Sequence, residues 1–277
     1  MTMSHSGSAA ELDDAQWRPI EGTLLDLGIP IVLLRELRSK LVSKFDALLL
    51  YGSWARGDAD TDSDVDILVL NYTGAVPQSD GAVSVALYTD GQLRDASGTL
   101  FGYHLRRDGR ILLDKDGQLA TLLGEIAPPV PGRLIERIRS LTPVLDMPLV
   151  DRATYIEGLT QVARYLLRSA LYAEALAQNQ TCFSVREIAH RKGDHALVTV
   201  LSSHKAVRQP ASNEVFDDLC RRLEEVIGVL EPNPYGDLHG LVEGAWSSNQ
   251  ELSNFGTLAL SNDDEDLPYD ELPKVVL

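Results

Sequence analysis

The sequence predicts an α+β protein in which a small mixed β-sheet core with packed helices precedes an all-α helical bundle. Three observations predict this class. Short apolar runs with the alternation typical of β-strands occur only in the first half of the chain. Apolar residues at helical spacing dominate the second half. A proline-rich segment, 128–132, separates the two halves, because proline fixes φ and removes a hydrogen-bond donor.

We expect four parts along the chain. Residues 1–13 are small and polar and are predicted to be a disordered N-terminus. Residues 14–127 form the first domain and residues 133–260 form the helical bundle. Residues 261–277 contain a run of four acidic residues and two prolines, which indicates a solvated acidic tail.

The composition indicates a globular protein, with 277 residues of which 44% are hydrophobic and 24% are charged. No apolar run approaches the roughly 20 residues that a bilayer-spanning helix needs, and residues 1–10 lack the features of a signal peptide. We therefore expect a cytoplasmic protein with no membrane partner. Cys182 and Cys220 are too few for a disulfide framework or a cysteine zinc site, and we expect buried free thiols.

The net charge constrains the partners. The chain has 25 Lys plus Arg against 41 Asp plus Glu, a formal charge of −16. This balance argues against tight binding to nucleic acid, which depends on neutralising phosphates. A cationic or neutral acceptor is easier to accommodate.

In the first half, helices are predicted before and after the first strands. A helix over 14–27 has Trp17 as its large anchor, and a second helix runs from Pro30 to residue 45, because proline suits the first helical turn. A third helix is expected over 97–107, entered through a serine or threonine cap. These helices would pack on a sheet whose expected strands are 48–51, 65–70, 83–88 and 110–114.

In the second half, the periodicity predicts a bundle of helices. The expected helices are 155–177, with Asp151 as its start cap, then 184–191, 194–204, one that begins at Ser212 and one over 238–246. The helix that begins at Ser212 has a broad apolar face, which indicates a central place in the bundle.

Two carboxylates in the first domain indicate a binding site for a divalent metal ion. Side chains of a strand alternate between faces, so Asp64 and Asp66 point the same way at the start of strand 65–70. Their Cα atoms are roughly 6.5 Å apart, which allows both to reach one divalent ion. Oxygen ligands of this kind suit Mg²⁺ or Mn²⁺.

Residues at the end of the preceding strand are suited to bind the phosphates of a substrate beside this metal ion. Gly52 has no Cβ to keep a phosphate away from the backbone N–H groups, and the hydroxyl of Ser53 can donate to a phosphate oxygen. Arg56, four residues after the glycine, can neutralise the β and γ phosphates of a triphosphate.

The pattern of Gly-Ser, ten residues and Asp-x-Asp between apolar strands resembles the signature of the polymerase-β-like nucleotidyltransferase superfamily. It is most similar to the small members, the aminoglycoside nucleotidyltransferases and the nucleotidyltransferase partners of toxin–antitoxin pairs, over about residues 30–125. The resemblance implies a metal-dependent enzyme that transfers a nucleoside monophosphate from a triphosphate such as ATP to a hydroxyl, with release of pyrophosphate. Asp64 and Asp66 would be catalytic and would bind the metal.

The resemblance also implies the kinds of acceptor. They are a small molecule, such as an aminoglycoside-like antibiotic in a resistance enzyme, or a protein side chain. In such enzymes the helical bundle helps to form the acceptor pocket, often across a dimer, so a homodimer fits this layout. The sequence leaves open the acceptor, the nucleotide base and the oligomeric state.

Ser84 departs from the superfamily pattern. Members with full catalytic equipment carry a third carboxylate on the third strand, and the best register places Ser84 there. Serine is a poor general base. Either Asp80 or Asp90 supplies the base, or the proton leaves to water, or catalysis is lost. In the last case the chain is a nucleotide-binding regulatory or antitoxin-like protein.

The helix over 97–107 offers three further side chains, His104, Arg106 and Arg107. They reach a triphosphate if this helix faces the cleft. In the alternative interpretation they form a basic turn that faces solvent.

Overall fold

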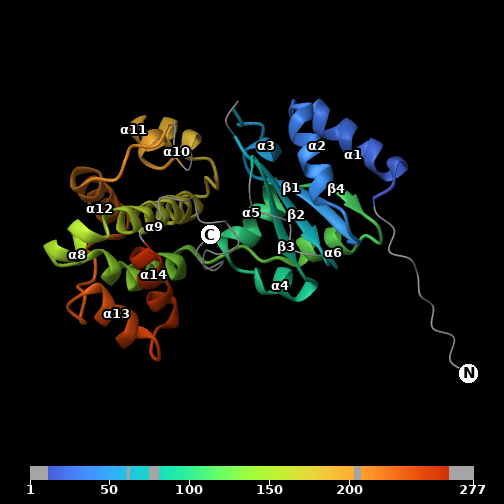
Figure 1. Cartoon of the computed structure of the whole chain (residues 1–277). Coiled ribbons are helices and arrows are strands. Elements are labelled where there is room, and N and C mark those ends of the chain that lie inside the picture. Colours follow the sequence, from blue (N-terminus) through green and yellow to red (C-terminus); the bar gives the residue numbers. More distant parts are fainter. Residues whose placement is uncertain (1–11, 61–62, 75–80, 203–206, 262–277) are drawn as a thin grey trace, which may run out of the picture. The chain divides into compact units, whose positions relative to one another are not determined.

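A computed structural model of the protein describes residues 12–60, 63–74, 81–202 and 207–261. The chain divides into two compact units (Figure 1). The first comprises the residues up to Ser97 together with Gly102–Ala127, and the second comprises Gly98–Phe101 and the residues from Pro128 onward. Most of the expected disordered N-terminus, nearly all of the acidic tail, and Asp80 lie outside the described residues.

The first unit is built on a four-stranded mixed sheet. Its strands are β1 (Ala47–Tyr51), β2 (Val65–Leu70), β3 (Val83–Tyr88) and β4 (Arg110–Asp114). Their order is β3-β2-β1-β4; β1 is antiparallel to β2 and β4, whereas β2 and β3 are parallel. Together with the helical second unit, this sheet confirms the predicted α+β class.

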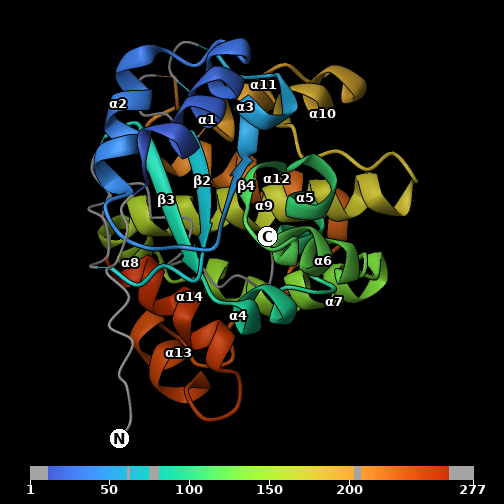
Figure 2. The same ribbon diagram turned by 90° about the vertical axis from the view of Figure 1, so that its right-hand side faces the viewer.

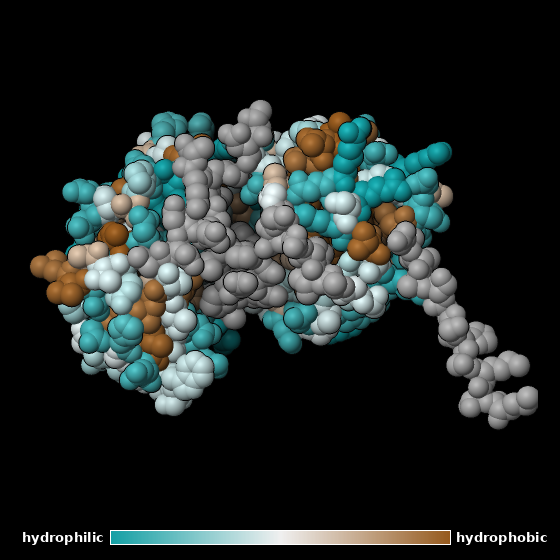
Figure 3. All heavy atoms as spheres, viewed as in Figure 1, coloured by the Kyte–Doolittle hydropathy of each residue, from teal (hydrophilic) through white to brown (hydrophobic). Residues whose placement is uncertain are grey.

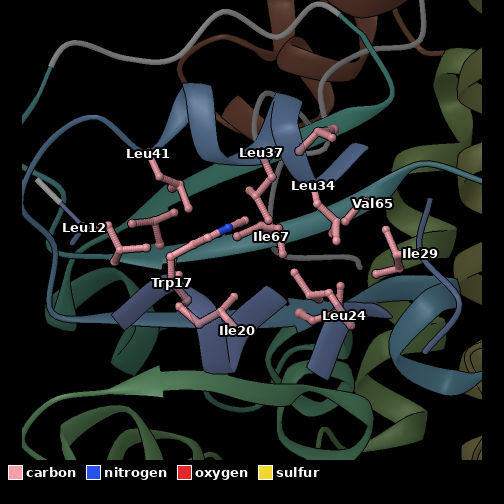
Figure 4. Packing of buried hydrophobic residues seen from close by; sticks show 14 of the residues in the cluster. Leu12, Trp17, Ile20, Leu24, Ile29, Leu34, Leu37, Leu41, Val65 and Ile67 are labelled. Carbon is pink, nitrogen blue, oxygen red and sulfur yellow. The ribbon is translucent and has the colours of Figure 1, made fainter. Parts of the chain in front are cut away.

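Helices α1 (Asp14–Asp26) and α2 (Ile31–Lys40) cover one face of the sheet. Figure 4 shows their side chains, among them Trp17 and Leu37, packed with Ile67 of β2. Trp17, Leu37 and Ile67 are at most 2% exposed. These contacts bury the apolar side of each helix against the apolar side of the strands, which is the main source of stability for such a layer.

Helix α2 ends earlier than the sequence pattern predicts. The helix was expected to continue to residue 45, but Leu41 leaves the helical region at φ −97° and ψ 53°. Leu41 and Phe45 are nevertheless buried in the same core. The apolar periodicity continues beyond Lys40 because loop side chains also contribute to the core.

Two side chains of α2 hold the start of the edge strand β3. The backbone N–H of Val83 donates to Glu36 Oε1 at 3.2 Å, and Lys40 Nζ donates to the Val83 carbonyl at 2.9 Å. Glu36 and Lys40 also form an ion pair at 3.3 Å. Backbone groups at a sheet edge need such partners, so this clamp helps to fix the register of β3.

Four short helices complete the first unit and extend the sequence predictions. They are α3 (Gly52–Arg56), α4 (Asp90–Asp95), α5 (Leu100–Asp108) and α6 (Gln118–Glu125) (Figures 1 and 2). The segment of α3 was expected to be a turn and loop, and α5 was expected over 97–107. Neither α4 nor α6 was expected, although a Thr89–Gln92 capping box begins α4 and the Asp114 carboxylate accepts from the first turn of α6.

In the part of the second unit that the structure describes, all regular secondary structure is helical. Its elements are α7 (Pro131–Leu141), the 3-10 helix η1 (Thr142–Leu145), α8 (Leu149–Thr154), α9 (Ile156–Ala177), α10 (Val185–Lys192), α11 (Ala196–Val200), α12 (Asn213–Ile227), α13 (Leu238–Ala245) and α14 (Gln250–Ser261). Helix α9 is mostly buried and packs against α7, α12 and α14. Ser184 and Ser212, where two of the helices were expected to begin, are the N-caps of α10 and α12.

Some predictions for the second unit were wrong. Asp151 lies within α8, where its carboxylate accepts from the N–H of Leu238 at 2.7 Å, and does not cap α9. Helix α11 is shorter than the predicted 194–204. Its last carbonyl, of Val200, accepts from Arg164 Nε at 2.9 Å. Helix α7 begins at Pro131, inside the expected break, because proline suits a first helical position.

Both cysteines are free thiols. Cys182 is buried, as expected, whereas Cys220 is only partly buried. Burial raises the pKa of Cys182 to about 11 and that of Cys220 to about 12, so both stay protonated at neutral pH. Among the described residues no helix is long and apolar enough to cross a membrane.

Hydrophobic side chains also reach the surface. Figure 3 shows such areas over α8 and over α2. Leu149 and Val150 of α8 and Val32 of α2 are largely exposed. Val32 is therefore a surface reference for substitutions in the core of the same unit.

A Leu50→Ala substitution tests the core of the first unit. Leu50 is fully buried on the central strand β1, so the substitution is expected to lower the free energy of unfolding by about 2–5 kcal/mol through lost burial and a new cavity. Urea denaturation followed by tryptophan fluorescence measures this loss, since Trp17 and Trp54 both pack in this core. The Val32→Ala control is expected to change the same quantity by less than about 0.5 kcal/mol. Equal effects of the two substitutions would contradict this packing.

Candidate functional site

Three neighbouring strands present Tyr51, Asp66 and Ser84 in one row at one end of the sheet. Tyr51 of β1 is paired with Asp66 of β2, and Asp66 is paired with Ser84 of β3. Val65 and Ile67 belong to the core under α1 and α2. Because strand side chains alternate, the row lies on the opposite face of the sheet.

Gly52 and Asp66 are in close contact. A Cβ on Gly52 would lie 2.1 Å from Asp66 Oδ2, so the carboxylate occupies the space beside the glycine Cα. Gly52 also has a φ of +74°, which residues with a side chain rarely adopt. Two independent constraints therefore require glycine where β1 passes into α3.

The environment of Asp66 disfavours its charge. The pKa of Asp66 is raised to about 7, chiefly by burial and also by the negative charge of Asp64, while the positive charge of Arg56 opposes both effects. Asp64 itself is exposed at the start of β2. A cation between the two carboxylates would relieve both the desolvation and the repulsion.

The donor set fits a hard divalent ion that is shared with a substrate. Mg²⁺ is commonly bound by one or two carboxylates together with substrate phosphates and water. In the described parts of the chain no group of three or more His, Cys, Asp or Glu side chains could hold a metal. The Asp64–Asp66 pair therefore fits an ion whose other ligands come from a bound phosphate compound.

Arg56 is the last residue of α3 and provides the nearest positive charge. Its Nη2 lies 3.2 Å from Asp58 Oδ1, and its side chain is 18% exposed. Its Nη1 lies 3.4 Å from His104 Nε2. Its buried Nε has no hydrogen-bond partner within the described residues.

His104 of α5 is buried, so the interpretation of a solvent-facing basic turn was wrong for this residue, whereas Arg106 and Arg107 are exposed, as that interpretation expected. The pKa of His104 is lowered to about 3, chiefly by burial and also by the positive charges of Arg56 and Arg107, so the imidazole is neutral at pH 7. Its ring meets that of Tyr51 edge to face, with centroids 6.4 Å apart.

The two arginines of α5 have other partners. Arg106 Nη1 donates to the Ile126 carbonyl at 2.6 Å, and Arg107 lies 3.6 Å from Asp108. Of the three residues proposed in this helix, only His104 has an observed contact with Arg56.

The loop between α3 and β2 is held by short-range contacts. The Ser53 carbonyl accepts from the N–H groups of Gly57 and Asp58 at 2.9 and 3.1 Å, which ends α3. The Trp54 indole donates to the Ser63 carbonyl at 3.1 Å. These contacts close the end of α3, to which Ser53 belongs, and fix the residue before Asp64.

Asp90 lies at the wrong end of β3 to act as the base. Tyr88 lies four positions after Ser84, roughly 13 Å along the strand, and Asp90 follows beyond it. Its carboxylate accepts from Asn71 Nδ2 at 2.9 Å and from Gln118 Nε2. Asp90 therefore joins the loop after β2 to α6, and the prediction of a catalytic role for it was wrong.

Sequence reasoning missed the contacts among Tyr51, Asp58, Arg56 and His104. Tyr51 is the last residue of a strand that ends at the Gly-Ser motif, and this position could have identified it as a residue of the site. The proximity of His104 depends on how α5 packs on β1, which no local pattern encodes.

Comparison with known families locates a match in the same region. Residues 33–90 match a family described as "Nucleotidyltransferase domain". This segment includes β1, α3, β2 and β3, so the resemblance to the polymerase-β-like superfamily is confirmed there. No curated protein sequence matches the chain. The match supports transfer of a nucleotidyl group as the general activity, with a nucleotide as substrate.

A Gly52→Ala substitution tests the contact with Asp66. The new Cβ would displace the carboxylate, and we expect Mn²⁺ affinity measured by calorimetry to fall at least about tenfold. Gly57→Ala is the matched control, because its φ is +81° but its Cβ would meet nothing within 4 Å. Both substitutions should cost about 1–2 kcal/mol of stability through the backbone. Equal Mn²⁺ affinity in the two variants would contradict a role for this contact.

The raised pKa of Asp66 predicts a pH dependence of metal binding. Below pH 7 the carboxyl is protonated and protons compete with the ion, so affinity decreases as pH falls. Between pH 8 and pH 5.5 the affinity for Mn²⁺ should fall about 30-fold, since each pH unit below the pKa costs about tenfold. Calorimetry at both pH values measures this. An unchanged affinity would show that Asp66 does not bind the ion as a carboxylate.

Proposed function

We propose that the protein is a metal-dependent nucleotidyltransferase that moves a nucleoside monophosphate from a triphosphate to a hydroxyl acceptor and releases pyrophosphate. One observation carries this proposal. The Asp66 carboxylate lies against Gly52 at the end of β1, inside the segment that matches the nucleotidyltransferase domain. This contact supports the proposal because it brings a carboxylate next to the first residue of α3, where a phosphate would bind.

The residues of the site have distinct proposed roles. Asp64 and Asp66 would hold Mg²⁺ or Mn²⁺, which when bound neutralises phosphate charge and aligns the reacting groups. Gly52 leaves space for Asp66, and its backbone N–H would donate to a phosphate. Ser53 would donate its hydroxyl to a phosphate oxygen. Arg56 would balance the charge of the outer phosphates and of the departing pyrophosphate.

A serine at position 84 is compatible with this chemistry. Phosphoryl-type transfers pass through loose transition states in which positioning and charge stabilisation contribute most of the catalysis. The acceptor proton can then leave to water late in the reaction. Ser84 removes one carboxylate beside Asp66, so we expect slower turnover rather than a different reaction.

The acceptor is proposed from charge and superfamily layout. A formal charge of −16 favours a cationic polyhydroxylated small molecule, such as an aminoglycoside-like antibiotic, with ATP or another triphosphate as donor. A protein hydroxyl is the alternative acceptor, as in the toxin–antitoxin relatives. A homodimer would fit the first case.

A second candidate function follows from the pairing of Ser84 with Asp66. A nucleotide-binding regulatory or antitoxin-like protein would keep the metal pair and the phosphate-binding turn but would turn over slowly or not at all. Tight triphosphate binding without pyrophosphate release would distinguish it from the transferase.

Pyrophosphate release from each common nucleoside triphosphate, with Mg²⁺ or Mn²⁺ and a panel of aminoglycosides, tests the transferase. Asp64→Ala and Asp66→Ala should each lower the rate by at least about 10³-fold, because the ion loses a ligand. Asp116→Asn, which removes an exposed carboxylate, is the control and should leave the rate unchanged. Full activity in either alanine variant would refute the assignment. Triphosphate binding without release in the unmodified protein would favour the regulatory function.

A further inference from the structure

We infer that His104 is a positioning residue that orients the Arg56 guanidinium toward the outer phosphates of a bound triphosphate. The inference rests on the proposed function, since it assumes a polyphosphate at this site. The observation that carries it is the approach of Arg56 Nη1 to His104 Nε2, 3.4 Å apart at the end of the sheet that holds Asp66.

The donor chemistry fixes the direction of this interaction. A guanidinium can only donate hydrogen bonds, so His104 Nε2 must accept with its lone pair and the ring proton must reside on Nδ1. The depressed pKa of His104 agrees with a neutral ring. The ring of Tyr51, packed edge to face against the imidazole, limits its rotation.

Arg56 is held at both of its ends. At the backbone end, Arg110 Nε donates to the carbonyl of Ala55 at 2.7 Å, which ties α3 to the start of β4. At the guanidinium end, His104 contacts Nη1 and Asp58 contacts Nη2. This arrangement leaves the guanidinium little rotational freedom.

One donor of the guanidinium still requires an acceptor. The Nε of Arg56 is buried and has no hydrogen-bond partner in the described part of the structure. A buried donor without a partner costs free energy, and a phosphate oxygen would satisfy it. Arg56 also lowers the pKa of Asp66, so its charge acts where the carboxylates and the phosphates would meet.

A neutral partner is better suited to orient the Arg56 guanidinium toward a phosphate than a second carboxylate is. Asp58 already pairs with Arg56, and another negative charge would cancel the attraction for an anion. An imidazole orients the guanidinium through one lone pair and leaves its charge available.

Inorganic tripolyphosphate with Mg²⁺ is the probe, because its binding requires neither the correct base nor turnover. Calorimetry is expected to show that His104→Leu weakens binding about tenfold, as expected for one hydrogen bond to a charged group. His104→Gln places an amide oxygen near the position of Nε2 and should stay within about threefold of the unmodified protein. Arg94→Ala, which removes an exposed arginine paired with Glu125, is the control for loss of positive charge.

A double-mutant cycle separates positioning from a general structural role. In an Arg56→Ala background, His104→Leu should have no further effect on tripolyphosphate binding, because no guanidinium remains to be oriented. An equal loss in both backgrounds would overturn the inference, as would an unchanged affinity in His104→Leu alone. Thermal denaturation of His104→Leu and His104→Gln shows whether the variants fold equally well.

The tripolyphosphate experiments can fail or succeed independently of the pyrophosphate release assay that tests the proposed function. In one outcome, tripolyphosphate binds and His104→Leu has no effect in the Arg56→Ala background, while no triphosphate releases pyrophosphate. In that case the transferase assignment fails and the role of His104 stands. If the unmodified protein does not bind tripolyphosphate with Mg²⁺, the inference about His104 is overturned.

Discussion

The arrangement of the first unit depends on the contact between the Asp66 carboxylate and the Cα of Gly52. A carboxylate can lie so close only to a residue without Cβ, and the backbone at that point has a positive φ. Burial in this position raises the pKa of Asp66 to about 7 and makes its negative charge unfavourable unless a cation compensates it. Under the proposed function, a metal ion at this point would compensate the unfavourable negative charge.

The rest of the unit keeps this contact in place. The core under α1 and α2 fixes β1 and β2, while Glu36 and Lys40 hold the start of the edge strand β3. Trp54 contributes to the same core and anchors the loop just before Asp64. Arg56 and His104 approach from α3 and α5. Each element supplies one constraint, and together they bring the charges of Asp64 and Arg56 near Asp66.

Much of this arrangement could be predicted from the sequence, for physical reasons that also explain what was missed. All four strands follow from short apolar runs, and their period of two places Asp64 and Asp66 together. Helices α9 and α12 follow from long apolar stripes. Helix α3 has five residues and α4 has six, too short for a periodic pattern. Asp151 looked like a cap, but its carboxylate binds the start of α13.

The environment of His104 could not be derived from sequence because it depends on tertiary packing. A histidine followed by two arginines on a short helix is typical of a solvated surface, yet α5 turns it inward against Tyr51. For Asp90 the sequence suggested a functional role that the structure does not support. Its position after β3 suggested that it acts as the general base, but the parallel pairing of β2 and β3 puts it at the far end of the sheet.

The most direct test of the account is the anomalous scattering of Mn²⁺ in crystals grown with a non-hydrolysable nucleoside triphosphate. The account predicts a manganese peak bonded to carboxylate oxygens of both Asp64 and Asp66 and to phosphate oxygens, at about 2.0–2.2 Å as for similar hard ions. The outer phosphates should lie next to Ser53 and Arg56. A bound triphosphate without manganese at these carboxylates, or manganese bound elsewhere, would contradict it.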